Sequence, residues 1–217
     1  MNLKNKDTDH YFSSEPKSEE RFGLVRACLC DRNFEFLTAS SVFSKTKIDL
    51  GTRLLIESMI LPKTGTILDI GCGYGAVGIV AAKLNPKLFL LMTDVNARAV
   101  RLARKNLEAN KISNAEVRHG CLYEPVKESR FNTVLSNPPV SAGMDTVKAI
   151  VVQAPKVMAD NATFQMVIRS KIGAKILPEL FCETFGNCSV IARGSGFRVL
   201  MGQYCSPKLE ERLSDHN

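Results

Sequence analysis

The chain has 217 residues, of which 45% are hydrophobic and 24% charged, proportions that suit a single soluble domain with a full core. Its formal net charge of +7 favours an acidic partner, for which nucleic acid is the usual candidate. No apolar run approaches the roughly 18 residues of a membrane span, and the opening residues MNLKNKDTDH lack an apolar signal region. We therefore expect a cytoplasmic protein without a membrane segment.

Seven cysteines and three histidines are present, without the paired spacing of zinc ligands, so no metal site is expected. The first 20 residues are polar and form an expected lead-in, and residues 206–217 an expected polar tail. Between them, residues 21–205 are expected to form one domain. Its first part, 21–61, combines a β-hairpin (22–30 and 33–40) with a helix over 50–61 that Pro62 ends.

From residue 62 to residue 205, short apolar segments alternate with helical patterns. The expected strands cover 66–71, 87–94, 115–120, 131–137, 163–170, 187–193 and 197–205. The expected helices cover 76–84, 96–111, 144–158 and 173–185. This alternation predicts an α/β fold of the doubly wound, Rossmann-like type, with a mostly parallel sheet and helices on both faces.

A glycine-rich turn, LDIGCGYGAVG, follows the first strand of this core. Gly71, Gly73 and Gly75 permit a tight turn and a close approach of backbone to ligand, at the edge where such folds bind ligands. Asp69, inside the apolar strand, needs a buried hydrogen-bonding partner. A simple tight turn between strand and helix is the alternative interpretation.

The next strand ends in Asp94, about twenty residues after the turn, where an acid can bind both ribose hydroxyls of a cofactor. A nicotinamide cofactor and S-adenosylmethionine both fit this pattern. An N-cap for the helix that follows is the alternative role of Asp94. The third strand ends at Gly120 and Cys121, which would then border the adenine.

The fourth strand runs into SNPPV. Pro138 and Pro139 have no backbone donor, and Asn137 before them is kept out of helical geometry. The Asn137 amide oxygen and the Pro138 carbonyl would accept both N–H groups of a flat exocyclic amine and direct its lone pair toward a methyl sulfonium. A dehydrogenase does not need this arrangement, whereas an ordinary turn is the structural alternative.

Together, DIGCGYGAVGI, TDVN and SNPPV resemble the class I S-adenosylmethionine-dependent methyltransferases with an Asn-Pro-Pro motif. HYFSSEP, VFSKTKIDLGTRLLIE and GFRVL narrow the resemblance to the small-domain methyltransferase family, in its short archaeal single-domain form. The family includes enzymes that methylate guanine N2 in small-subunit ribosomal RNA. The resemblance implies a seven-stranded sheet with an antiparallel last strand, S-adenosylmethionine as cofactor, and an RNA or ribosomal-subunit partner.

The resemblance also assigns site residues. The implied catalytic residues are Asn137, Pro138 and Pro139. The implied cofactor-binding residues are Asp49, Thr52, Asp69, Gly71, Cys72, Gly73, Gly75, Asp94, Val95, Asn96, Gly120, Cys121 and Asn137. For Asp49 and Thr52, a role in capping the helix that follows is an equal alternative.

The substrate side departs from the wider Asn-Pro-Pro group, because Val140 stands where an aromatic often stacks on the substrate. Phe43 or Phe197 would then supply the stacking. Lys45, Lys47 and Arg169, with Lys171 and Lys175, form a basic group at the expected mouth, while Arg98, Arg101, Arg104 and Lys105 are interpreted as a solvated helix face. Glutamine-N5 methylation of protein, adenine-N6 methylation of nucleic acid and a non-catalytic binding module remain the alternative functions.

Overall fold

The computed structural model describes residues 19–42, 44 and 46–206, so Phe43, Lys45, most of the expected lead-in and nearly all of the expected tail lie outside it. The strands are β1 (Phe22–Leu29), β2 (Arg32–Ala39), β3 (Gly65–Ile70), β4 (Leu88–Asp94), β5 (Ala115–His119), β6 (Phe131–Ser136), β7 (Met158–Arg169), β8 (Ser189–Gly194) and β9 (Phe197–Gln203). The helices are α1 (Leu50–Ser58), α2 (Ala76–Leu84), α3 (Ala97–Ala109), α4 (Met144–Gln153) and α5 (Ile176–Phe185), with 3₁₀ turns at Glu124–Val126, Val140–Ala142 and Ala154–Val157.

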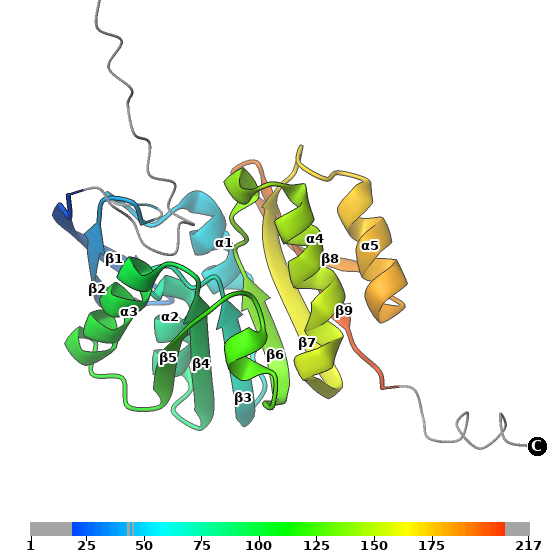
Figure 1. Ribbon diagram of the computed structural model, residues 1–217, viewed down its shortest axis with the longest axis horizontal. Coiled ribbons are helices and arrows are strands. Elements are labelled where there is room, and N and C mark those ends of the chain that lie inside the picture. The colour runs from blue at the N-terminus through cyan, green and yellow to red at the C-terminus, as the bar shows by residue number, and fades with distance from the viewer. Residues whose placement is uncertain (1–18, 43, 45, 207–217) are drawn as a thin grey trace, which may run out of the picture.

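Seven of these strands form one sheet in the order β5-β4-β3-β6-β7-β9-β8 (Figure 1). The strands from β5 to β7 pair in parallel, and β9 runs antiparallel to both β7 and β8. This confirms the expected Rossmann-like sheet, its antiparallel last strand and the separate β1–β2 hairpin. The chain reverses its direction across the sheet between β3 and β6, and such folds bind ligands in the crevice at this point.

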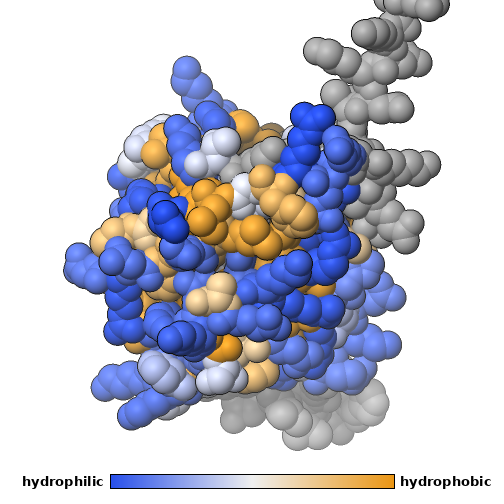
Figure 2. All heavy atoms as spheres, turned by 90° about the vertical axis from the view of Figure 1, so that its left-hand side faces the viewer, coloured by the Kyte–Doolittle hydropathy of each residue, from blue (hydrophilic) through white to orange (hydrophobic). Residues whose placement is uncertain are grey.

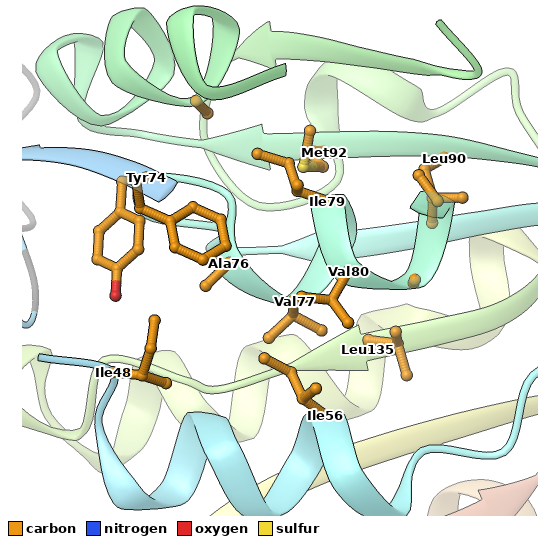
Figure 3. Close-up of a cluster of buried hydrophobic side chains, with 14 of the residues drawn as sticks. Ile48, Ile56, Tyr74, Ala76, Val77, Ile79, Val80, Leu90, Met92 and Leu135 are labelled. Carbon is orange, nitrogen blue, oxygen red and sulfur yellow. The ribbon is translucent and has the colours of Figure 1, made fainter. Parts of the chain in front are cut away.

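Two hydrophobic cores cover the two faces of the sheet. Helices α1, α2 and α3 pack with the hairpin on one face, while α4 and α5 cover the other. In Figure 3, Ile56 of α1 points toward Val77 and Val80 of α2, and Ile48 lies near Tyr74. Helix α1 is therefore fixed in contact with the helix that follows the glycine-rich turn.

Helix α1 ends three residues earlier than the sequence predicts. The buried side chain of Gln165 on β7 explains this, because its Oε1 accepts from the Ile60 N–H at 2.9 Å and its Nε2 donates to the Ile60 carbonyl at 2.7 Å. The backbone of Ile60 thus finds its partners in β7 instead of in a further helical turn. On the other face, α4 ends at Gln153 and not at 158, because Pro155 has no N–H to continue it.

The expectation of a solvated basic face on α3 is wrong for Arg98. Its side chain is 7% exposed, donates to the Ser40 carbonyl at 2.9 Å and lies 3.9 Å from Glu20. Arg101 pairs with Glu20 as well, at 2.8 Å. These arginines therefore hold the segments that precede and follow the hairpin against α3.

Asn106 of α3 makes a second link to the hairpin. Its Oδ1 accepts from the Leu37 N–H at 2.7 Å, and its Nδ2 donates to the carbonyls of Leu37 and Tyr74. Through this one buried amide, the hairpin, α3 and the glycine-rich turn share a fixed arrangement.

The face that carries the hairpin is largely hydrophilic, with an apolar area among the polar residues (Figure 2). In the part of the chain that the structure describes, no helix has the length and apolar character needed to cross a membrane.

Candidate active site

A cavity of about 740 Å³ opens at the carboxyl ends of the central strands, beside the start of α1. Its size suits a cofactor together with part of a substrate. The sequence-predicted residues that line it are Asp49, Thr52, Asp69, Gly71, Cys72, Gly73, Asp94, Val95, Gly120, Cys121, Asn137, Pro138, Pro139, Val140, Arg169 and Phe197. The structure therefore gathers residues from seven separate segments around one space.

The turn after β3 presents bare backbone to this cavity. Gly71 and Gly73 have φ angles of 70° and 58°, and a Cβ atom added to either would meet nothing within 4 Å. The Gly71 and Cys72 N–H groups donate to the Thr93 carbonyl, which fixes the turn against β4. A residue with a side chain would be strained at these φ angles, and the side chain would project into open space. With glycine at both positions, the backbone of the turn stays accessible and forms a cradle for a ligand.

Asp94, the last residue of β4, is held by the backbone around it. Its Oδ2 accepts from the Gly73 N–H and its Oδ1 from the Asn96 N–H, both at 2.8 Å. The helix cap is Asn96, whose Oδ1 accepts from the Arg98 and Ala99 N–H groups, so the capping alternative for Asp94 is wrong. Each Asp94 oxygen keeps a lone pair for ligand hydroxyls.

Asp69 lies beneath the turn with 1% of its surface exposed, and its Oδ2 accepts from the Gly78 N–H at 2.9 Å. This is the partner that a buried acid requires. Burial, with a smaller contribution from the nearby charge of Asp94, raises the pKa of Asp69 to about 7, although the Gly78 N–H opposes the shift. Burial likewise raises the pKa of Asp94. Two carboxyl groups in a low-dielectric setting favour a ligand that carries positive charge.

Asn137 directly follows β6, the strand that pairs with the Asp69 strand β3, and lies half-buried in the cavity wall. Its Nδ2 donates to Thr52 Oγ1 of α1 at 2.9 Å. With the amide nitrogen engaged, Oδ1 remains as an acceptor without a hydrogen bond among residues 19–42, 44 and 46–206. The Pro138 carbonyl accepts from the Val140 N–H at 2.9 Å and keeps its second lone pair.

Of the two roles that the sequence leaves open for Asp49 and Thr52, the structure shows the capping role for Asp49. Asp49 is the N-cap of α1, and its Oδ2 accepts from the Gly51 and Thr52 N–H groups at 2.9 and 3.1 Å. Both side chains also line the cavity. The cap fixes the first turn of α1, and this part of the helix places the Thr52 hydroxyl beside Asn137.

Three predicted residues are not part of the cavity wall. Gly75 is the N-cap of α2, where a Cβ atom would meet Ile79 and Ala103, Asn96 is a fully buried cap, and Lys47 is exposed outside the lining. Phe43 and Lys45 are not described. Conversely, the sequence interpretation missed several lining residues, among them Val42, Tyr74, Val77, Leu122, Asp145, Thr146 and Ile172. Asp145 and Thr146 could have been found, because the first turn of α4 directly follows the Asn-Pro-Pro loop.

The residues present fit S-adenosylmethionine. The glycine cradle and the adjacent carboxyl groups would hold its charged methionine part, Asp94 its ribose, and Val95, Cys121 and Leu122 its adenine. Among the described residues no group of three potential metal ligands is found. The cavity thus has one half suited to this cofactor and another half, around Asn137, left for a substrate.

Comparison with known proteins identifies the family. Residues 33–201 match the sequence model of the methyltransferase small domain. The uncharacterised protein YbxB of Bacillus subtilis is 34% identical over 89% of this chain and 97% of its own length. Ribosomal RNA small subunit methyltransferase C of Photorhabdus laumondii is 34% identical over 75% of this chain but only 48% of its own length.

Among solved structures, a T. thermophilus 16S rRNA N2 methyltransferase, in complex with AdoMet and guanosine, superimposes with a TM-score of 0.75. It is 24% identical, and the match covers 87% of this chain and 52% of that one, so this likeness supports the fold alone. The chain spans about half the length of these methyltransferases. On the family match and the B. subtilis relative, the chain belongs to the methyltransferase small domain family.

Proposed function

We propose that this chain methylates the exocyclic N2 amine of guanine in ribosomal RNA. The observation that carries the proposal is the fixed amide of Asn137 in the cavity wall, whose nitrogen donates to Thr52 Oγ1 at 2.9 Å while its oxygen has no hydrogen bond among the described residues. Because the amide nitrogen is held on the Thr52 side, the oxygen is the atom left to accept an N–H group from a substrate. The site is therefore suited to an amine substrate.

Membership of the family makes the chain an S-adenosylmethionine-dependent methyltransferase, as the sequence predicted. The cofactor supplies an electrophilic methyl group on a sulfonium. The chain's own residues orient the amine, because the Asn137 oxygen and the second lone pair of the Pro138 carbonyl would bind its two N–H groups. These acceptors also stabilise the positive charge that develops on the nitrogen during transfer.

Ribosomal RNA is the proposed substrate for two reasons. Two relatives named ribosomal RNA small subunit methyltransferase C share about a third of their residues with this chain over about three quarters of its length. The structural neighbour from T. thermophilus is bound to guanosine. The net charge of +7 also suits a polyanion. A bacterial-type ribosomal substrate would place the activity in the cytoplasm.

Mass spectrometry of ribosomal RNA nucleosides tests the proposal, with cells that contain or lack the gene. We expect loss of N2-methylguanosine from one position of the small-subunit RNA, and its restoration by the purified protein with S-adenosylmethionine. Parallel assays should include DNA and a glutamine-containing peptide. Methylation of adenine N6 or of glutamine instead would overturn the guanine assignment.

Asn137→Ala supplies the control for catalysis. We expect this variant to bind S-adenosylhomocysteine with wild-type affinity and to lose methyl transfer. If Asn137→Ala transferred methyl groups at the wild-type rate, the amide would have no role in the reaction. If wild-type protein bound the cofactor but methylated none of the substrates, a binding module would be the better description.

A further inference from the structure

An arginine and a phenylalanine form a stacked pair on the substrate side of the cavity. Arg169 is the last residue of β7, Phe197 is the first residue of β9, and the two are direct partners in the antiparallel ladder. The Arg169 Cζ lies 5.0 Å from the centroid of the Phe197 ring. Both residues line the cavity that Asn137 also lines.

The position of this pair relative to Asn137 follows from the sheet. Strands β6 and β7 are parallel neighbours, with Ser136 opposite Met166, so the chain that continues through Asn137 to Pro139 runs beside the last residues of β7. Asn137 is bonded to α1 through Thr52, and Phe197 also packs on α1. The amine-binding amide and the stacked pair therefore belong to the same wall, next to the start of α1.

Phe197 is not free to stack on a substrate itself. Its ring is 8% exposed and lies so close to Gly51 that a Cβ there would come within 2.8 Å of Cε1. Helix α1 thus supports the ring from one side, and Arg169 lies over it. The expectation that Phe197 provides the stacking surface is therefore replaced, because Arg169 is the exposed member of the pair that lines the cavity.

A base that leaves its stack to react needs a flat partner in the enzyme. In this chain Val140 takes the place after Pro139, and the aromatic residues that the described cavity wall contains are Tyr74 and Phe197. Tyr74 belongs to the glycine-rich turn on the cofactor side and is 4% exposed. A guanidinium is planar and delocalised, stacks on aromatic faces and is used in this way to bind unstacked RNA bases.

We propose that Arg169, supported by the Phe197 ring, is the surface on which the target base stacks, and that it is the residue that selects an aromatic amine over an aliphatic amide. The inference rests on the proposed function and specifies how that function distinguishes its substrate. The plane of the guanidinium binds the base, and its charge adds attraction for the electron-rich purine face.

Arg169→Lys tests the proposal because it keeps the charge and removes the plane. We expect kcat/KM for ribosomal RNA to fall roughly ten- to hundredfold, the size of one lost stacking contact. Binding of S-adenosylhomocysteine and the melting temperature should stay at wild-type values. Arg193→Lys is the matched control, since Arg193 is an exposed arginine on β8, the strand beside β9, and lies outside the cavity lining, so it should leave kcat/KM unchanged.

A second readout does not depend on turnover. The nucleoside of 2-aminopurine carries the same exocyclic amine as guanine and loses fluorescence when it stacks. Titrated into protein saturated with S-adenosylhomocysteine, it should be quenched by the wild type and by Arg193→Lys, and much less by Arg169→Lys.

If Arg169→Lys showed the same quenching and the same kcat/KM as the wild type, the inference would be overturned, since charge alone would then suffice. Absence of RNA methylation by the wild type would instead refute the proposed function, and in that case the fluorescence titration still decides whether Arg169 stacks on a purine.

Discussion

At the scale of single residues, the contact between Thr52 and Asn137 holds the Asn137 amide in place at the cavity wall. The two residues are 85 positions apart, and their side chains meet at 2.9 Å. Without this contact the amide would be free to leave the orientation that it has in the structure. Thr52 is thus a positioning residue that acts through Asn137.

Thr52→Val replaces the hydroxyl by a methyl group of similar shape. We expect kcat to fall between ten- and a hundredfold, because a misoriented group costs rate even when every partner is present. The dissociation constant of S-adenosylhomocysteine, measured by calorimetry, should change less than threefold.

Thr52→Ser is the matched control, since it keeps the hydroxyl and should retain most of the wild-type kcat. A merely structural role of Thr52 would appear as a lower melting temperature with unchanged kcat. That outcome in Thr52→Val would show that the amide does not depend on this contact.

Asp69 makes the unfolding free energy depend on pH. Its pKa is about 7 in the folded chain and close to 3.8 when unfolded, so between these values the native state holds a proton that the unfolded chain has released. The unfolding free energy therefore falls as pH rises from about 4 to 7, by at most about 1.4 kcal/mol per pH unit from this group. Above pH 7 the contribution no longer changes.

Urea unfolding of the cofactor-free protein at several pH values between 5 and 8 measures this dependence. We expect Asp69→Asn, which cannot titrate, to become more stable relative to the wild type as pH rises toward 7. Asp145→Asn removes an exposed carboxyl group at the same cavity and should keep the wild-type slope. Equal slopes for Asp69→Asn and the wild type would contradict a raised pKa.

At the scale of elements, the seating of α1 on β9 depends on the absence of a side chain at one position. Gly51 lies in the first turn of α1, and a Cβ there would come within 2.8 Å of the Phe197 ring and 3.0 Å of Asp49 Oδ2. Helical propensity alone would favour alanine by about 1 kcal/mol. The close contact of the added Cβ with the Phe197 ring, which is itself packed, opposes this gain in helical propensity.

We expect Gly51→Ala to lower the unfolding free energy by about 1–3 kcal/mol through overpacking. Chemical denaturation of Gly51→Ala, Phe197→Leu and the double variant forms a cycle that isolates the contact. In the double variant the alanine should cost less, since leucine at 197 leaves room. A stabilised Gly51→Ala single variant would mean that propensity outweighs packing here.

The elements also show where sequence reasoning succeeds. The alternating strands and helices, the glycine turn and the Asn-Pro-Pro loop follow from local patterns, because each depends on backbone conformations that neighbouring residues impose. The link of Gln165 to Ile60 and the buried Arg98 could not be predicted, since each joins segments far apart in the sequence through one side chain. For the same reason the sequence identifies Arg169 and Phe197 as separate candidates but not as a stacked pair.

At the scale of the whole molecule, exposed lysines lie at both edges of the sheet, and one pair lies at the edge where the cavity opens. Lys171 and Lys175 are exposed in the segment between β7 and α5, which follows the carboxyl edge of the sheet where the cavity opens. Lys63 and Lys87 are exposed just before β3 and β4, at the opposite edge. If RNA approaches the cavity, phosphates contact the first pair and not the second.

Salt dependence distinguishes the two edges. Binding of ribosomal RNA to the wild type should weaken linearly in a plot of log affinity against log salt, and loss of each phosphate contact should reduce the slope by about 0.7–0.9. We expect a shallower slope and weaker binding for Lys171→Ala/Lys175→Ala, measured by filter binding between 50 and 300 mM salt, roughly the range over which such contacts are screened. Lys63→Ala/Lys87→Ala removes the same charge and should keep the wild-type slope. Equal slope changes in both double variants would show that the RNA responds to net charge alone, and that the cavity edge has no special share in binding it.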